Sequence, residues 1–149
     1  LITLLESVPE YWKPMLTMLT SRVGDHRTDE GRALLEEHSP LSWVDRISAP
    51  LLIGQGANDP RVKQAESDQI VQAMQQKGIP VTYVLYPDEG HGFARPENRL
   101  SFFAISEAFL SRHLGGRAEP IGDDFEKSSV RVDVGAAEVP GVEEALAAG

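Results

Sequence analysis

Two side chains in this sequence have the types and the spacing to act together on a proton. Asp59 stands in residues 56–62 (GANDPRV), here named the acid loop, and His91 stands in residues 87–93 (PDEGHGF), here named the histidine loop. A histidine that works as a general base needs an acceptor at its second ring nitrogen, which fixes the tautomer and stabilises the imidazolium that forms. A carboxylate meets that need. The pair therefore predicts acid–base chemistry in which Asp59 orients His91.

The neighbours of the two residues leave both a functional and a structural explanation open. Gly90 and Gly92 carry no side chain, so the backbone can turn tightly and leave both edges of the imidazole accessible. A single loop histidine is nevertheless more often a surface residue. Asp59, which stands before Pro60, could be only the N-cap of a helix. It is the succession of an acid loop and a histidine loop that favours catalysis.

Regular elements on either side must position these loops. Residues 50–56 (PLLIGQG) form an apolar run opened by proline and closed by glycine, and residues 81–86 (VTYVLY) are mostly β-branched or aromatic; both patterns are typical of strands buried on two faces. A helix is predicted over 62–77, with Gly78 as its stop, and a long helix over 96–114. This succession predicts an α/β fold with parallel strands and flanking helices.

In an open parallel sheet, functional loops follow the carboxyl ends of the strands. The acid loop and the histidine loop leave two consecutive parallel strands at the same edge. We therefore expect the side chains of Asp59 and His91 to meet there.

The beginning of the chain is predicted to be helical. Helices are expected over residues 9–22, where Pro14 can delay the start, and over residues 29–38. One or two further turns are expected over 42–47.

The end of the chain has a different composition. Residues 117–149 hold eight of the 23 acidic residues and three of the 14 basic ones, and they are rich in Gly, Ala and Pro. An exposed strand at 130–134 and a short helix at 142–147 are predicted within them. We interpret residues 1–116 as the structural unit that carries the site and residues 117–149 as an acidic C-terminal extension, not a domain.

Composition excludes several classes of function. The net charge is −9 and no basic face is evident, so no nucleic-acid partner is expected. No apolar run approaches the length of a membrane helix, so no membrane partner is expected. Cysteine is absent, which rules out a thiol nucleophile and favours, without proving, a cytoplasmic location. No metal motif such as HExxH occurs, and Asp88, Glu89 and His91 on one turn lack a fourth ligand. We expect no cofactor.

The two motifs together resemble a known family. The stretches SPLSWVDRISAPLLIGQGANDPRVKQAES and YPDEGHGF, with the long helix after them, are similar to the C-terminal part of the catalytic domain of the prolyl oligopeptidase family of serine peptidases. The branch looks like the acylaminoacyl-peptidase or dipeptidyl-aminopeptidase type. The resemblance covers nearly all of residues 1–116. It implies part of an α/β-hydrolase fold, an incomplete domain, in which Asp59 orients the catalytic base His91.

The nucleophile of that family is missing here. Its serine stands in a G-x-S-x-G elbow, and no such motif occurs in this sequence; Ser7 and Ser21 precede Asp59 but lack flanking glycines. Since the order in α/β-hydrolases is nucleophile, acid, histidine, the serine is expected upstream of Leu1. The resemblance thus implies a fragment whose partners are the rest of the catalytic domain, a β-propeller and a short peptide substrate.

Two other functions remain open at this point. The chain could be a non-catalytic α/β module for binding or assembly that keeps the scaffold, or part of an esterase built on the same scaffold. A G-x-S-x-G elbow upstream of Leu1 would favour an enzyme, and its absence would favour the module.

Overall fold

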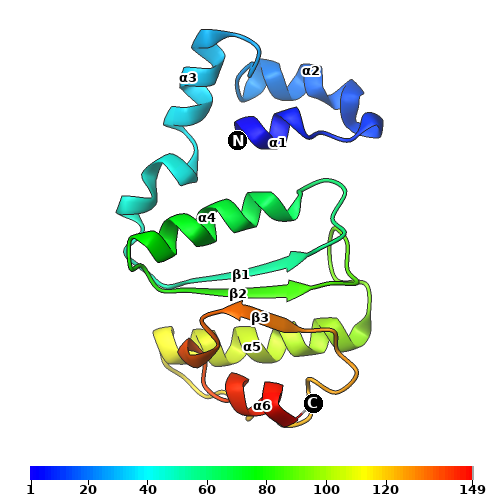
Figure 1. Cartoon of the computed structure of the whole chain (residues 1–149), viewed down its shortest axis with the longest axis vertical. Coiled ribbons are helices and arrows are strands. Elements are labelled where there is room, and N and C mark those ends of the chain that lie inside the picture. The colour runs from blue at the N-terminus through cyan, green and yellow to red at the C-terminus, as the bar shows by residue number, and fades with distance from the viewer. Residues whose placement is uncertain (149) are drawn as a thin grey trace.

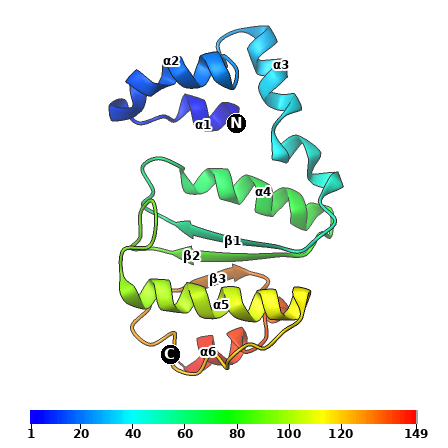
Figure 2. The same ribbon diagram turned by 180° about the vertical axis from the view of Figure 1, so that it is seen from behind.

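A three-stranded sheet separates two helical layers in this computed structural model, which describes residues 1–148 (Figure 1). The strands are β1 (Leu51–Gly56), β2 (Val81–Tyr86) and β3 (Arg131–Val134). The helical elements are α1 (Ile2–Glu6), η1 (Glu10–Trp12), α2 (Lys13–Arg22), α3 (Asp29–Glu37), η2 (Pro40–Arg46), α4 (Gln64–Gln76), α5 (Pro96–Leu114), η3 (Ala136–Glu138) and α6 (Val142–Ala148), the η elements being 3₁₀ helices. Figures 1 and 2 agree that α4 covers one face of the sheet and that α5 and α6 cover the other, with α1 to α3 beyond α4.

Strands β1 and β2 are parallel, as predicted, and pair in register from Leu51–Val81 to Gly56–Tyr86. Every residue of β2 is buried. Because side chains alternate along a strand, β2 contributes to two cores. Its odd-numbered residues Val81, Tyr83 and Leu85 pack with α4 and η2. Val84 and Tyr86 pack with α5 and the C-terminal segment. The predicted α/β fold of parallel strands with flanking helices is confirmed.

The helices match the sequence prediction except near the chain start and the acid loop. Helix α5 begins at Pro96 and ends before Gly115, whose φ is 77°. Helix α4 starts two residues later than expected, because the acid loop is followed by Lys63, which is the N-cap of the helix. The predicted helix over 9–22 consists of η1 followed by α2, which fits the delaying effect of Pro14. Helix α1 has five residues, too few for a periodic pattern, and was not predicted.

Residues 117–148 contribute several apolar side chains to the core. Their apolar side chains join the cluster around α5; they are Ile121, Phe125, Val139, Val142 and Ala145, each at most 7% exposed. Strand β3 pairs antiparallel with β2. The reason is the path of the chain: after α5 it returns to the carboxyl edge of β2, where Ser129 contacts Asp88, and β3 runs back from there. The division at residue 116 stays a prediction.

Strand β3 covers one edge of the parallel pair. In the structure β2 is the central strand of the order β1-β2-β3, and Val84 pairs with Val132. Within residues 1–148 the free edge of the parallel pair is that of β1.

Residues 1–148 contain no helix that is long and apolar enough to cross a membrane.

Candidate active site

The acid loop holds one oxygen of the Asp59 carboxylate in a fixed position. Oδ1 accepts hydrogen bonds from the backbone N–H of Arg61 at 2.8 Å and of Val62 at 2.9 Å. The residue is 8% exposed. These donors belong to the loop and not to the first turn of α4, so Asp59 is not the N-cap of that helix, although its type and position suggested this.

The second oxygen of Asp59 meets His91. Oδ2 lies 2.8 Å from His91 Nδ1. The His91 side chain is 43% exposed, while that of Asp59 is 8% exposed. The carboxylate is therefore enclosed, whereas the ring reaches the surface, where a substrate could approach it. The expected proximity of the two side chains is confirmed, and their roles in catalysis stay a prediction.

The hydrogen bonds also determine the charge of the acid. Burial by itself raises the pKa of the Asp59 carboxyl, but hydrogen bonds from the amides of Val62 and Arg61 and from His91 outweigh it, so the net pKa lies below its usual range. Asp59 is thus ionised at neutral pH and can only accept. His91 must then donate from Nδ1, which leaves the lone pair of a neutral ring on Nε2. This is the tautomer that a general base requires.

Backbone hydrogen bonds join the two loops. The N–H of Ala57 donates to the Tyr86 carbonyl at 3.0 Å, and the N–H of Asn58 donates to the Glu89 carbonyl at 2.9 Å. The Asn58 side-chain amide donates to the Pro87 carbonyl at 2.7 Å. The position of Asp59 relative to His91 is therefore set by the backbone beside it as well as by the side-chain contact. Asn58 was not singled out by its residue type, since a loop asparagine has many roles.

Positions 56 and 92 favour glycine for two different structural reasons. A Cβ on Gly56 would lie 2.3 Å from the carbonyl oxygen of Gly90, so the close approach of the two loops requires glycine at position 56. Gly92 has a φ of +100°, a conformation that other residues rarely adopt. The tight turn expected around His91 is present, with Gly90 and Gly92 paired as an isolated β-bridge.

A cavity of about 370 Å³ lies beside the pair and is lined by Asp59, His91, Gly90, Phe93, Ser67 and neighbouring residues. The hydroxyl of Ser67 donates to Gln55 Oε1 at 2.7 Å and so is engaged elsewhere. The hydroxyls of Ser7 and Ser21 donate to backbone carbonyls within their own helices. Among residues 1–148 no serine hydroxyl makes a hydrogen bond to His91. This part of the chain therefore holds an acid and a base but shows no nucleophile beside them.

The carboxylates near His91 are engaged with other partners. Asp88 forms an ion pair with Arg95, and Glu89 accepts hydrogen bonds from the backbone N–H of Ala94 and Arg95. Over residues 1–148 no group of three or more His, Cys, Asp or Glu residues is arranged to hold a metal ion. The chemistry that the arrangement supports is proton transfer by His91.

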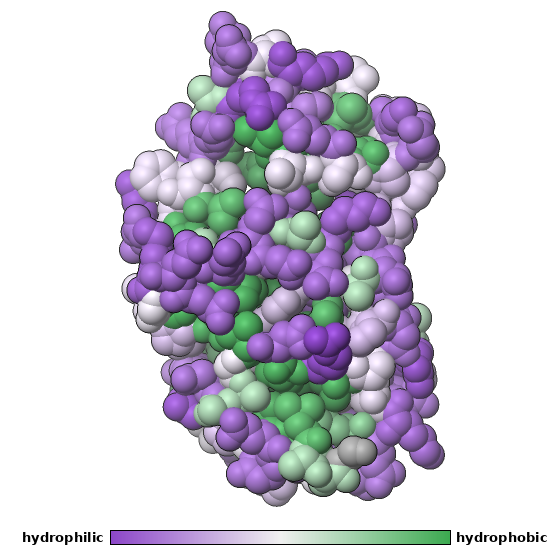
Figure 3. Space-filling view, in the orientation of Figure 1, coloured by the Kyte–Doolittle hydropathy of each residue, from purple (hydrophilic) through white to green (hydrophobic). Residues whose placement is uncertain are grey.

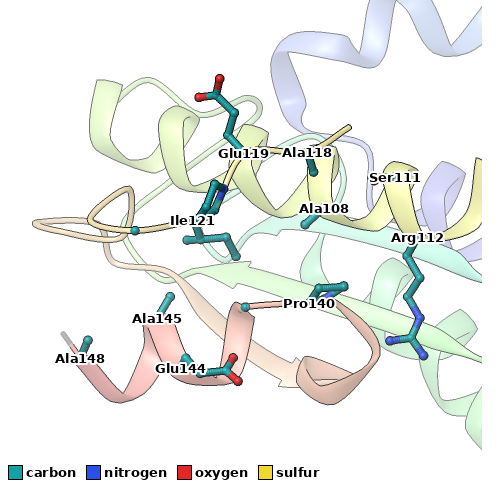
Figure 4. Close-up of a pocket in the computed structure, with 13 residues that line it drawn as sticks. Ala108, Ser111, Arg112, Ala118, Glu119, Ile121, Pro140, Glu144, Ala145 and Ala148 are labelled. Atoms are coloured by element: carbon teal, nitrogen blue, oxygen red, sulfur yellow. The ribbon is translucent and has the colours of Figure 1, made fainter. Parts of the chain in front are cut away.

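A larger cavity, of about 750 Å³, lies away from this pair (Figure 4). It is formed by the last turns of α5, the segment after that helix and α6. Figure 3 shows apolar residues gathered on the lower part of the molecule, in the region where Figure 1 draws β3 and α6. Arg112 at the side of the cavity forms an ion pair with Glu138, and the Ser111 hydroxyl donates to the Gly116 carbonyl. Its lining therefore offers apolar surface but no free nucleophile with a base beside it.

The chain is similar to proteins of a known family. The model of the prolyl oligopeptidase family matches residues 9–117. Dipeptidyl aminopeptidase BIII of Pseudoxanthomonas mexicana is 66% identical over 144 residues, which are 97% of this chain and 21% of that protein. Dipeptidyl peptidase family member 6 of Caenorhabditis elegans is 50% identical over 121 residues, 80% of this chain and 16% of that protein.

A solved structure shows the same fold. The puromycin-hydrolyzing peptidase of Mycobacterium tuberculosis superposes with a TM-score of 0.69 at 27% identity, over 80% of this chain and 17% of the other. The chain spans about one fifth of the length of the two curated relatives. Since the family model covers most of the sequence, including the acid loop and the histidine loop, the chain belongs to the prolyl oligopeptidase family of serine peptidases.

Proposed function

We propose that Asp59 and His91 are the acid and the base of a serine triad that hydrolyses short peptides by acyl transfer. The observation that carries the proposal is the hydrogen bond of 2.8 Å between Asp59 Oδ2 and His91 Nδ1, with Oδ1 anchored by two backbone amides. The nucleophilic serine comes from the full-length protein, in a part that precedes residue 1. Family membership supports this assignment, because the family uses a serine nucleophile.

The reaction follows from the tautomer that Asp59 imposes. The serine hydroxyl attacks the peptide carbonyl while His91 Nε2 takes its proton, and the Asp59 carboxylate stabilises the imidazolium. His91 then returns the proton to the leaving amine, and the carbonyl remains attached to the serine as an ester. A water molecule, deprotonated by His91, attacks that ester; His91 then gives this proton to the serine oxygen, which leaves as the free hydroxyl as the acid is released. Asp59 stays ionised throughout.

The substrate class and the missing partner are part of the same proposal. Two relatives are named as a dipeptidyl aminopeptidase and a dipeptidyl peptidase, so the substrate is a short peptide from whose N-terminus a dipeptide is released. The rest of the catalytic domain pairs with the free edge of β1, since an unpaired strand edge leaves backbone N–H and C=O groups without partners. A β-propeller belongs to the proposal through the family resemblance alone.

The test compares the full-length protein with its His91→Ala variant on dipeptidyl aminocoumarin amides. We expect kcat to fall by about 10³-fold or more, since loss of the base removes the activation of the serine. His38→Ala is the matched control, because His38 is an exposed histidine at the end of α3, and it should leave kcat unchanged.

Three results would contradict the proposal in different ways. Activity of His91→Ala within tenfold of the parent would remove His91 from the mechanism. Hydrolysis of simple esters without any hydrolysis of peptides would indicate the esterase. An unmodified serine after treatment with a fluorophosphonate, together with no hydrolysis of either substrate, would indicate a non-catalytic module.

A further inference from the structure

The proposed triad leaves three buried polar side chains unused, one in the histidine loop and two in α5. Glu89 is 2% exposed, while Asn98 and Ser101 are both fully buried. Buried polar groups are costly unless they are hydrogen-bonded. The partners of these side chains therefore show what they hold in place. Glu89 belongs to the histidine loop, and Asn98 lies in the first turn of α5.

The Glu89 carboxylate closes the turn that carries His91. Oε2 accepts the N–H of Ala94 at 2.8 Å, and Oε1 accepts the N–H of Arg95 at 2.9 Å. Glu89 precedes His91 and the two donors follow it, so a single carboxylate spans the turn. The carbonyl oxygen of Glu89 also accepts the N–H of Asn58. Glu89 thus fixes the turn internally and relative to the acid loop.

Asn98 connects this turn to the segment that precedes β3. Its Nδ2 donates to Glu89 Oε1 at 2.9 Å and to Asp88 Oδ1 at 3.1 Å. Its Oδ1 accepts the N–H of Ser129 at 2.9 Å and the hydroxyl of Ser128 at 3.0 Å. With carboxylates on one side and donors on the other, the orientation of the carboxamide is determined. One side chain therefore contacts both the histidine loop and the C-terminal segment.

We propose that Asn98 is a positioning residue for His91, and that through Glu89 it couples the segment before β3 to the histidine loop. The inference rests on the proposed function, which gives His91 its role. Without the carboxamide, Glu89 Oε1 keeps one donor, the N–H of Arg95, and the N–H of Ser129 loses its acceptor. The turn then gains freedom relative to the acid loop. A displacement of about 1 Å in a catalytic group costs on the order of 100-fold in rate.

The experiment uses three variants of the full-length protein. Asn98→Ala removes the whole carboxamide. Asn98→Asp keeps the shape of the side chain and the acceptor for Ser129, but it replaces the donor to Glu89 with a carboxylate oxygen, so this link is both lost and made repulsive. Ile105→Ala is the control, because Ile105 is fully buried on the same helix and belongs to the apolar core. It lowers stability without removing a hydrogen bond of the network.

Two readouts separate positioning from general destabilisation. The first is kcat and KM per active site, with sites counted by fluorophosphonate labelling. The second is the downfield proton resonance of His91 Nδ1–H, which depends on the hydrogen bond to Asp59 and needs no turnover. The melting temperature of each variant is recorded beside them.

We expect both Asn98 variants to lower kcat by about 100-fold, to leave KM within about twofold, and to weaken the proton resonance. Ile105→Ala should lower the melting temperature while keeping kcat per site and the resonance. Asn98 variants that keep both kcat and the resonance would overturn the inference. If the parent protein hydrolyses no peptide, the proposed function fails and the resonance decides alone: its loss in Asn98→Asp supports the positioning role, and its persistence overturns it.

Discussion

The hydrogen bonds of Asp59 make the substitution Asp59→Asn a demanding test of the triad. Two backbone N–H groups, of Arg61 and Val62, point at Oδ1. An NH₂ group cannot accept them, so the carboxamide oxygen of the variant must occupy this position. Its NH₂ group then faces His91 Nδ1, from which the wild-type carboxylate accepts a hydrogen bond at an Nδ1–Oδ2 distance of 2.8 Å.

This arrangement should reverse the tautomer of His91. Facing an NH₂ donor, Nδ1 must accept, and the ring proton moves to Nε2, where it blocks the uptake of the serine proton. In serine peptidases this kind of replacement lowers kcat by about 10⁴-fold. That factor corresponds to about 5 kcal/mol of transition-state stabilisation. The loss comes from the tautomer and the missing charge, since shape and volume are conserved.

The assay is the hydrolysis of dipeptidyl aminocoumarin amides by the full-length protein. KM should change little, because the Asp59 side chain is only 8% exposed and so offers little surface to a substrate. Asp45→Asn is the matched control: Asp45 is 71% exposed, is paired with Lys77 at the surface, and should be neutral. An Asp59→Asn variant that is folded and keeps more than a tenth of the parent kcat would refute the tautomer argument.

Three further predictions concern acid stability, the C-terminal segment and the isolated chain. Burial raises the pKa of Glu89, but hydrogen bonds from Ala94, Asn98 and Arg95 outweigh it and lower the net pKa below the ordinary 4.5. Its stabilising contribution is therefore complete above about pH 4.5 and is lost as the pH falls through the lowered value. The melting temperature of Glu89→Gln should depend less on pH in that acid range than that of the parent, and parallel curves would contradict the assignment. Phe125→Ala should lower the free energy of unfolding by about 3–5 kcal/mol, because Phe125 is buried in the α5 cluster. In denaturant titrations Phe125→Leu should lower the free energy of unfolding by less than about 2 kcal/mol. Equal losses for the two Phe125 variants would mean that the segment after α5 is not packed as described. The chain of residues 1–149 alone should hydrolyse no peptide and react with no fluorophosphonate, and it should self-associate through the free edge of β1. A monomeric peak in size-exclusion chromatography with a cooperative unfolding transition at about 45–65 °C would disprove the expected self-association. Fluorophosphonate labelling at a serine of this chain would disprove the expected lack of reactivity.

The sequence by itself determined the elements whose signals are local. The six residues VTYVLY predicted a buried strand, and β2 has the predicted bounds. Pro96 and Gly115 marked the ends of α5 because one fits the first helical position and the other a left-handed stop. The sequence also determined that Asp59 and His91 share one edge, because the carboxyl ends of two parallel strands lie at the same edge of a sheet.

The tertiary structure decided what depends on residues that are distant along the chain. The pairing of Tyr83 with Val134 and the contact of Asn98 with Ser129 arise from the path of the segment after α5, which no local periodicity encodes. For the same reason, the composition of residues 117–149 shows their acidity but not that apolar side chains within residues 117–148 join the core around α5. The tertiary structure likewise decided that Asp59 Oδ1 is anchored by its own loop, since Asp before Pro is compatible with both a helix cap and a loop. Local patterns determine elements because propensity and burial act over a few residues, whereas the buried polar contacts behind His91 exist only when distant segments meet.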